Sequence, residues 1–199
     1  MTSDRLIAFA VFALVASVTP GPNNAMLLAS GVNFGLRRTA PHMLGVVIGF
    51  ALMVLSVGLG LQGVLNTVPL AFELIRWGGA AYMLYLAWKI ATAGEQADRD
   101  AGPKPISFLQ AVIFQWANPK AVITAATAMT TYRVDNTVTE LLTLILILTV
   151  VTVVSVSLWA AGGVAVRRFL HDPRHRRIFN ITMAVLLVAS LYPLLTTPR

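Results

Sequence analysis

Two short polar stretches interrupt segments of the chain that are otherwise strongly apolar. The first is TPGPNNAM at positions 19–26, and the second is NPKAV at positions 118–122. A proline inside a helix removes one backbone hydrogen bond and clashes with the preceding turn, at a cost of about 3 kcal/mol. Each stretch therefore predicts a broken helix whose freed carbonyl groups need hydrogen-bond partners.

Amide side chains stand beside both breaks. Asn23 and Asn24 follow the first break, and Gln115 precedes the second break by about one helical turn. Each amide can pair with freed backbone groups or can present its donor and acceptor to a solute. The candidate solute-binding residues at the two breaks are Thr19, Pro20, Gly21, Pro22, Asn23, Asn24, Gln115, Asn118, Pro119 and Lys120.

Lys120 adds a positive charge to the second break. If residues 107–131 form one helix, Lys120 lies roughly 17–20 Å from either end, which is farther than its side chain reaches. No acidic residue lies deep in a predicted helix, because Glu73 and Glu140 stand near helix starts. Three states are open for the ammonium: bonded to freed carbonyls, neutralised by loss of its proton, or paired with the carboxylate of a solute. A shifted helix with Lys120 at the membrane surface is the remaining alternative.

The composition indicates a membrane protein. Of the 199 residues, 57% are hydrophobic and only 12% are charged, whereas soluble domains carry about 25% charged residues. We predict an all-α polytopic membrane protein with six transmembrane helices. Their approximate ranges are 5–30, 41–65, 68–91, 107–131, 139–166 and 178–195. Pro41 fits the first turn of the second helix. The last helix is short, so a five-helix fold with residues 178–195 on the surface is the main alternative.

The membrane setting decides where the breaks must face. Hydrocarbon cannot satisfy freed carbonyls, so broken backbone at that depth survives only inside protein or beside a watery cavity. We therefore expect both breaks to face the interior of the bundle. Residues 6–18 could instead be the core of a cleavable signal peptide, but no A-x-A site follows them and the apolar pattern resumes after Asn24.

The distribution of charge predicts an orientation. The net charge is +7, and the cations lie in the gaps between apolar blocks. Cations in this position set the orientation of a membrane protein by the positive-inside rule, so we expect no nucleic-acid partner. Ten cations fall on one side, and we expect that side to be cytoplasmic and both termini to lie outside. These ten are Arg37, Arg38, Lys89, Arg99, Lys104, Arg167, Arg168, Arg174, Arg176 and Arg177.

The two halves of the chain have matching interruptions. A polar linker, residues 94–105, separates a first half, residues 1–93, from a second half, residues 106–199. Pro22 and Pro119 are 97 positions apart, and each half holds three predicted helices. An odd number of crossings turns the second half upside down, which predicts an inverted repeat of the kind common in secondary transporters.

Other residue patterns carry less information. Gly45 and Gly49 form a G-x-x-x-G pattern that fits either packing inside one subunit or a homodimer interface. Trp88 fits an interfacial aromatic belt, and Tyr82 on the same helix face is a candidate for lining a transport path. The histidines do not cluster and the chain has no cysteine. With no nucleotide or nucleophile motif either, we expect no metal, no cofactor and no enzymatic activity.

The chain carries TPGPNNAMLLASGVNFGLRR, RWGGAAYMLYLAWK and ISFLQAVIFQWANPKAV in this order. These stretches resemble signatures of the LysE/RhtB family of amino-acid exporters, the LysE-type translocators, over nearly the whole chain. The resemblance implies ion-driven export of amino acids across a bacterial inner membrane. It assigns function to Pro20, Gly21, Pro22, Asn23, Asn118, Pro119 and Lys120. Some members carry aspartates in the second and fourth helices, and their absence here argues against a cationic amino acid and leaves the coupling group open.

Together these features predict a secondary exporter of small amino acids or related carboxylates that works by proton antiport within the lipid bilayer. Half-helix N-termini and Lys120 would bind the carboxylate. Two alternatives stay open. One is a non-transporting membrane interaction protein, which would not need the paired breaks. The other is a transporter of a metal ion or another non-amino-acid solute. A metal ion would need acidic ligands, and the predicted helices have none at depth.

Overall fold

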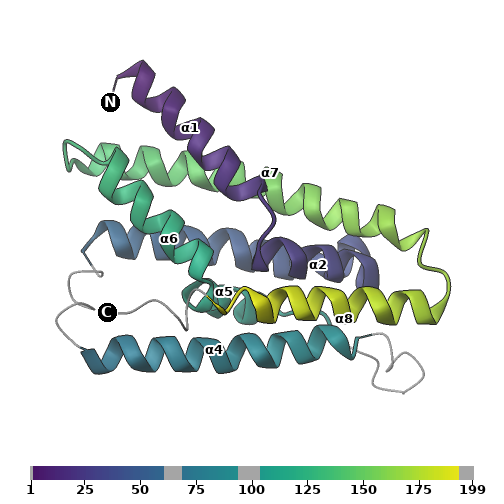
Figure 1. Ribbon diagram of the computed structural model, residues 1–199. Helices are drawn as coiled ribbons and strands as arrows, with labels where there is room; N and C mark the ends of the chain where they lie inside the picture. The colour runs from purple at the N-terminus through teal and green to yellow at the C-terminus, as the bar shows by residue number, and fades with distance from the viewer. Residues whose placement is uncertain (1, 61–68, 94–103, 193–199) are drawn as a thin grey trace.

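The computed structural model describes residues 2–60, 69–93 and 104–192, and every regular element within these ranges is helical. The helices lie roughly along a common axis and form one bundle (Figure 1). They are α1 (Ser3–Val18), α2 (Pro22–Gly58), α4 (Pro69–Ala91), α5 (Phe108–Ala117), α6 (Pro119–Thr127), the π-helix η1 (Ala128–Tyr132), α7 (Val138–Arg167) and α8 (Pro173–Ala189).

The first predicted break is confirmed. Helix α1 ends at Val18 and α2 begins at Pro22, with Gly21 extended between them at φ −173° and ψ 179°. A residue that precedes proline avoids the helical region, because the proline ring clashes with its backbone. Proline itself suits the first position of a helix, where no N–H partner is needed. The Gly21–Pro22 pair therefore ends one helix and starts the next.

The second break follows the same rule. Helix α5 ends at Ala117 and α6 begins at Pro119, and Asn118 between them is extended at φ −86° and ψ 106°. The Asn118 side chain caps α6 by accepting a hydrogen bond from the backbone N–H of Lys120 at 3.1 Å. The predicted helix at 107–131 thus exists as two helices and the π-helix that follows them.

Helix α2 differs from the prediction. It runs without a loop from Pro22 to Gly58, and it changes direction at Gly35, whose φ of 73° and ψ of 171° suit glycine alone. Thr39 joins the two arms, since its hydroxyl donates to Gly35 O at 2.7 Å and pairs with Ser30 Oγ at 3.1 Å. The prediction that a helix starts at Pro41 is therefore wrong, because Gly35 makes the turn and the helix resumes before the proline.

The remaining helices match the predicted ones in part. Helices α4 and α7 agree with the predicted ranges 68–91 and 139–166 to within a residue. Helix α8 begins five residues before the predicted start at 178, because Asp172 caps it by accepting from the backbone N–H of Arg174 at 2.7 Å. Helices α2 and α8 end at Gly58 and Ala189, earlier than the predicted ends at 65 and 195. Most of the predicted linker 94–105 lies outside the described residues.

The outer surface of the bundle suits lipid. Leu142, Leu146, Val150 and Leu158 follow one face of α7 at helical spacing, and all four are more than half exposed. Soluble monomers rarely expose so long an apolar stripe. Within the described ranges, α2 and α7 are long and apolar enough to cross a membrane, while the breaks divide α1, α5 and α6 into shorter pieces.

Basic residues collect at one end of the bundle. The turn of α2 near Gly35, the end of α7 and the start of α8 lie together at the right-hand end of Figure 1, and α1 begins at the other end. Arg37, Arg38, Arg167 and Arg174 belong to these three segments. This end of the bundle therefore carries a cluster of cations.

Helices α2 and α7 approach so closely that their backbones touch. A Cβ atom on Gly163 would lie 3.0 Å from Gly31 Cα and would overlap Leu28 O. The second arm of α2 packs on α5 in the same manner, because a Cβ on Gly49 would lie 2.7 Å from Val112 Cα. The G-x-x-x-G glycines thus pack inside the subunit, which leaves the homodimer untested.

We expect the Gly163→Ala variant to be strongly destabilised, because the new methyl group meets backbone that cannot move aside. Overpacking of this kind costs about 1–3 kcal/mol. Gly162→Ala is the matched control, since its Cβ would lie 3.7 Å from Leu28 Cδ1, an ordinary contact. Thermal unfolding in detergent should show a clearly lower midpoint for Gly163→Ala alone. Equal midpoints for the two variants would contradict the close contact.

Candidate functional site

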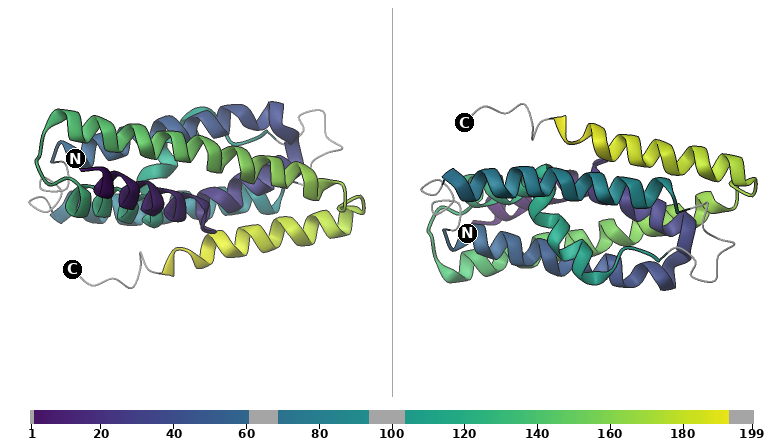
Figure 2. Two further views of the ribbon diagram at one scale, coloured as in Figure 1. Left: turned by 90° about the horizontal axis from the view of Figure 1, so that it is seen from above. Right: turned by 90° about the horizontal axis from the view of Figure 1, so that it is seen from below.

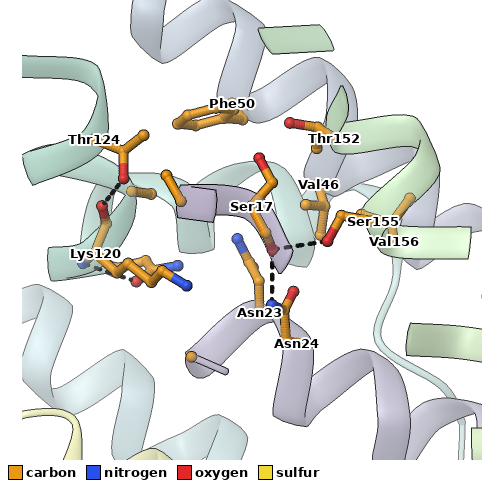
Figure 3. A pocket seen from close by; sticks show the side chains of 14 residues that line it. Ser17, Asn23, Asn24, Val46, Phe50, Lys120, Thr124, Thr152, Ser155 and Val156 are labelled. Carbon is orange, nitrogen blue, oxygen red and sulfur yellow. Dashed lines mark hydrogen bonds between the residues drawn. The ribbon is translucent and has the colours of Figure 1, made fainter. Parts of the chain in front are cut away.

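A cavity lies where the two helix breaks meet (Figure 3). Its walls come from α1, both arms of α2, α6 and α7. Five of the residues selected from the sequence line it: Gly21, Asn23, Asn24, Asn118 and Lys120. Asn24 and Asn118 are buried, so this part of each break faces the interior of the bundle, as expected for backbone that hydrocarbon cannot satisfy. Thr19 and Pro20 of the first break are exposed, so for them the expectation is wrong.

The carbonyls freed at the first break are hydrogen-bonded by side chains. Asn24 Nδ2 donates to Ser17 O and to Thr19 O, both at 2.9 Å. Ser155 Oγ on α7 donates to Ser17 O at 2.7 Å. Of the two uses predicted for Asn24, the structure supports pairing with the backbone.

Lys120 joins the two breaks. Its Nζ donates to Thr19 O, so in this structure the ammonium is bonded to a freed carbonyl, the first of the three predicted states. The stem of Lys120 passes over Gly21, where a Cβ atom would lie 2.7 Å from Lys120 Cδ. Glycine at this position therefore makes room for the lysine. Lys120 is the one charged residue among the described residues that line the cavity.

Two helix N-termini open on the cavity. Gly21 precedes α2, Asn118 precedes α6, and both residues line the cavity. The first N–H groups of a helix lack partners within it and carry partial positive charge. Together with Lys120, they make this region of the cavity attractive to an anion.

Asn23 and Gln115 form a reciprocal amide pair across the bundle. Asn23 Nδ2 donates to Gln115 Oε1 at 2.8 Å, and Gln115 Nε2 donates to Asn23 Oδ1 at 3.2 Å. Gln115 is fully buried and also donates to Ala111 O at 2.8 Å, so it does not reach the cavity. The pair ties α5 to α2 beside the two breaks.

The other selected residues shape the site without lining it. Pro20, Pro22 and Pro119 belong to the breaks, and Thr19 contributes its carbonyl oxygen as the acceptor described above. Tyr82 on α4 does not line this cavity, since its hydroxyl donates to Gln110 O at 2.9 Å. Its role in a transport path stays a prediction.

Sequence reasoning missed the wall opposite Lys120. Thr152, Ser155 and Val156 on α7, with Val46 and Phe50 on the second arm of α2, complete the cavity. The available signal was the run of hydroxyl residues at positions 149, 152, 155 and 157, but the sequence does not tell which of them face the cavity.

The described residues contain no group of three His, Asp or Glu side chains that could hold a metal ion. His42 is fully buried and its ring nitrogens have no hydrogen-bond partner within the described structure, but it is not among the residues that line the cavity. The cavity therefore offers amides, hydroxyls and one ammonium for binding a solute.

The chain resembles known proteins over nearly its full length. The family model described as "LysE type translocator" matches residues 14–191. The cysteine/O-acetylserine efflux proteins of Escherichia coli strain K12 and Shigella sonnei strain Ss046 are each 33% identical over 191 residues, which cover 94% of this chain and 96% of theirs. The protein of the same name from E. coli O139:H28 is 32% identical over the same shares. No solved structure matches the chain.

We expect Asn24→Ala to lower the thermal stability more than Ser155→Ala. Asn24 serves two carbonyls, whereas Ser17 O keeps the Asn24 amide when Ser155 is truncated. After Asn24→Ala each carbonyl keeps one donor, Ser155 on Ser17 O and Lys120 on Thr19 O. The variant therefore loses two hydrogen bonds where Ser155→Ala loses one, at about 0.5–1.5 kcal/mol each. Unfolding midpoints in detergent measure both effects.

The double variant should lose more than the sum of the single losses, because Ser17 O then has neither donor. Additive losses would mean that the two side chains do not share this carbonyl.

Proposed function

Because the chain belongs to the LysE type translocator family, we propose that it is a secondary exporter of small amino acids or related carboxylates. Members of this family are transporters, so the chain is a transporter and not an enzyme. The observation that carries the proposal is the cavity at the two breaks, in which Lys120 and two helix N-termini converge.

The charges around the cavity favour a carboxylate. The described lining includes an ammonium and two helix N-termini but no acidic side chain. A carboxylate is a stronger acceptor for an ammonium than a neutral carbonyl is. If the solute takes the Lys120 ammonium from Thr19 O, that carbonyl keeps the hydrogen bond from Asn24. The exchange therefore leaves the Thr19 carbonyl with a hydrogen-bond partner.

The relatives suggest which amino acids to test first. The proteins at 33% identity are named for efflux of cysteine and O-acetylserine. Both solutes are small and carry no charge on the side chain, which suits a cavity whose described lining has no acidic group for a cationic side chain. Transport of a metal ion fits less well, for the same lack of acidic ligands.

The proposed architecture is six spans in two inverted repeats, residues 1–93 and 106–199, joined by the linker 94–105. Helices α1 and α5 approach the cavity from opposite ends of the bundle in Figure 2, which supports the inversion. The two repeats would rock about the cavity to open it to one side at a time. The basic end would face the cytoplasm of a bacterial inner membrane and both termini would lie outside.

We expect Lys120→Ala to lose about 10- to 100-fold in transport rate, which corresponds to the loss of a hydrogen bond to a charged group. The assay is counterflow in reconstituted vesicles with a mixed amino-acid pool, read by mass spectrometry. Lys104→Ala is the matched control, because Lys104 is exposed and does not line the cavity.

Undiminished counterflow by a folded Lys120→Ala protein would remove Lys120 from the proposed site. If the wild-type protein moves no amino acid at all, the chain is better explained as a non-transporting membrane protein or as a carrier of another solute.

Proton antiport makes a separate prediction. Vesicles loaded with the amino acid should release it several-fold faster when the outside is made acidic, because protons flow inward as the solute leaves. A protonophore should abolish the acceleration. If release does not depend on the proton gradient but responds to a sodium gradient, sodium and not the proton is the coupling ion.

A further inference from the structure

The hydroxyl group of Thr152 is buried without a hydrogen-bond partner. The residue is 6% exposed, it lines the cavity, and its Oγ1 has no partner among the described residues. A buried hydroxyl without a partner is costly, so native structures rarely leave one in that state without a reason.

Neighbouring hydroxyls on the same helix behave differently. Thr143, Thr149 and Ser157 on α7 each donate to the carbonyl four residues earlier, at 2.7–2.8 Å. This back-bond is the ordinary solution for a hydroxyl inside a helix. Thr152 does not make it, and its side chain instead lies at the cavity (Figure 3).

Three other polar side chains that line the cavity already have hydrogen-bond partners within the protein. Ser155 donates to Ser17 O, Thr124 donates to Lys120 O, and Asn23 is paired with Gln115. On the α7 wall of the cavity, Thr152 is therefore the hydroxyl that remains able to bond a solute.

Thr152 stands across the cavity from Lys120. Figure 3 shows Lys120 and Thr124 on one side and Thr152 with Ser155 on the other, with Phe50 between the two sides. A solute whose carboxylate is held by Lys120 would direct the rest of the molecule toward Thr152. The wall there also includes Val46 and Val156, so it is apolar apart from hydroxyl groups.

We propose that Thr152 is the specificity-determining residue, and that its hydroxyl bonds the side chain of the exported amino acid. The exporter then prefers a small side chain that ends in a hydroxyl, a thiol or an ester over an aliphatic side chain of equal size. This inference rests on the proposed function, because it assumes that the cavity takes the amino acid with its carboxylate at Lys120.

The test compares substrates that differ in one group. L-serine, L-cysteine and L-2-aminobutyrate have side chains of similar size that end in a hydroxyl, a thiol and a methyl group. In counterflow under reducing conditions, Thr152→Val should lower the preference for serine and cysteine over aminobutyrate about three- to tenfold, the range for one neutral hydrogen bond. Thr152→Ser should retain the preference.

Thr149→Val is the matched control, because Thr149 lies on the same helix, does not line the cavity and bonds only its own backbone. It should leave the preference unchanged. Thr152→Val should also unfold at the same temperature as the wild type or higher, since it removes an unpaired hydroxyl.

Two results would overturn the inference while leaving the proposed function intact. One is an unchanged preference in an active Thr152→Val protein. The other is a clear loss of thermal stability in that variant, which would mean that the hydroxyl already has a structural partner. Failure of the proposed function gives a different result, since the wild type would then move none of the three amino acids.

Discussion

The backbone carbonyls that lose their helical hydrogen bonds at the two breaks determine how the helices pack around the cavity. Lipid cannot hydrogen-bond them, so each one needs a donor from within the protein. At the first break the donors are Asn24, Ser155 and Lys120, which come from α2, α7 and α6. Satisfying the break between α1 and α2 thus draws α6 and α7 against it, and these helices line the cavity.

The groups that stabilise the breaks are also the groups that could bind a solute. The breaks expose helix N-termini in the protein interior, and the lysine that serves a freed carbonyl is also the only charge in the described lining. A site built from groups that already bond one another can change partners at low cost. Thr19 O illustrates this, because it has two donors and can release one of them without being left unpaired.

Local rules explain which parts of the fold the sequence could predict. The X-Pro pairs at Gly21–Pro22 and Asn118–Pro119 constrain their own backbone, so both breaks were predictable. The turn at Gly35 was not, because the segment continues as helix on either side and Pro41 offered a more familiar start signal. The α7 wall was hidden for another reason. A helix that is apolar all round has no periodicity to mark its inward face, so the role of Thr152 depended on knowing its neighbours.

The contact between Gly31 and Gly163 limits how this bundle can move. Interfaces made of side chains can slide, because rotamers change and fill the gaps that open. Here backbone rests on backbone, so separating the two helices would open a void that no side chain could fill, whereas pivoting them keeps the contact. In a rocking motion the crossing would act as a pivot: a small tilt there would become a larger displacement at the helix ends, where the mouths of a transport route would have to open and shut.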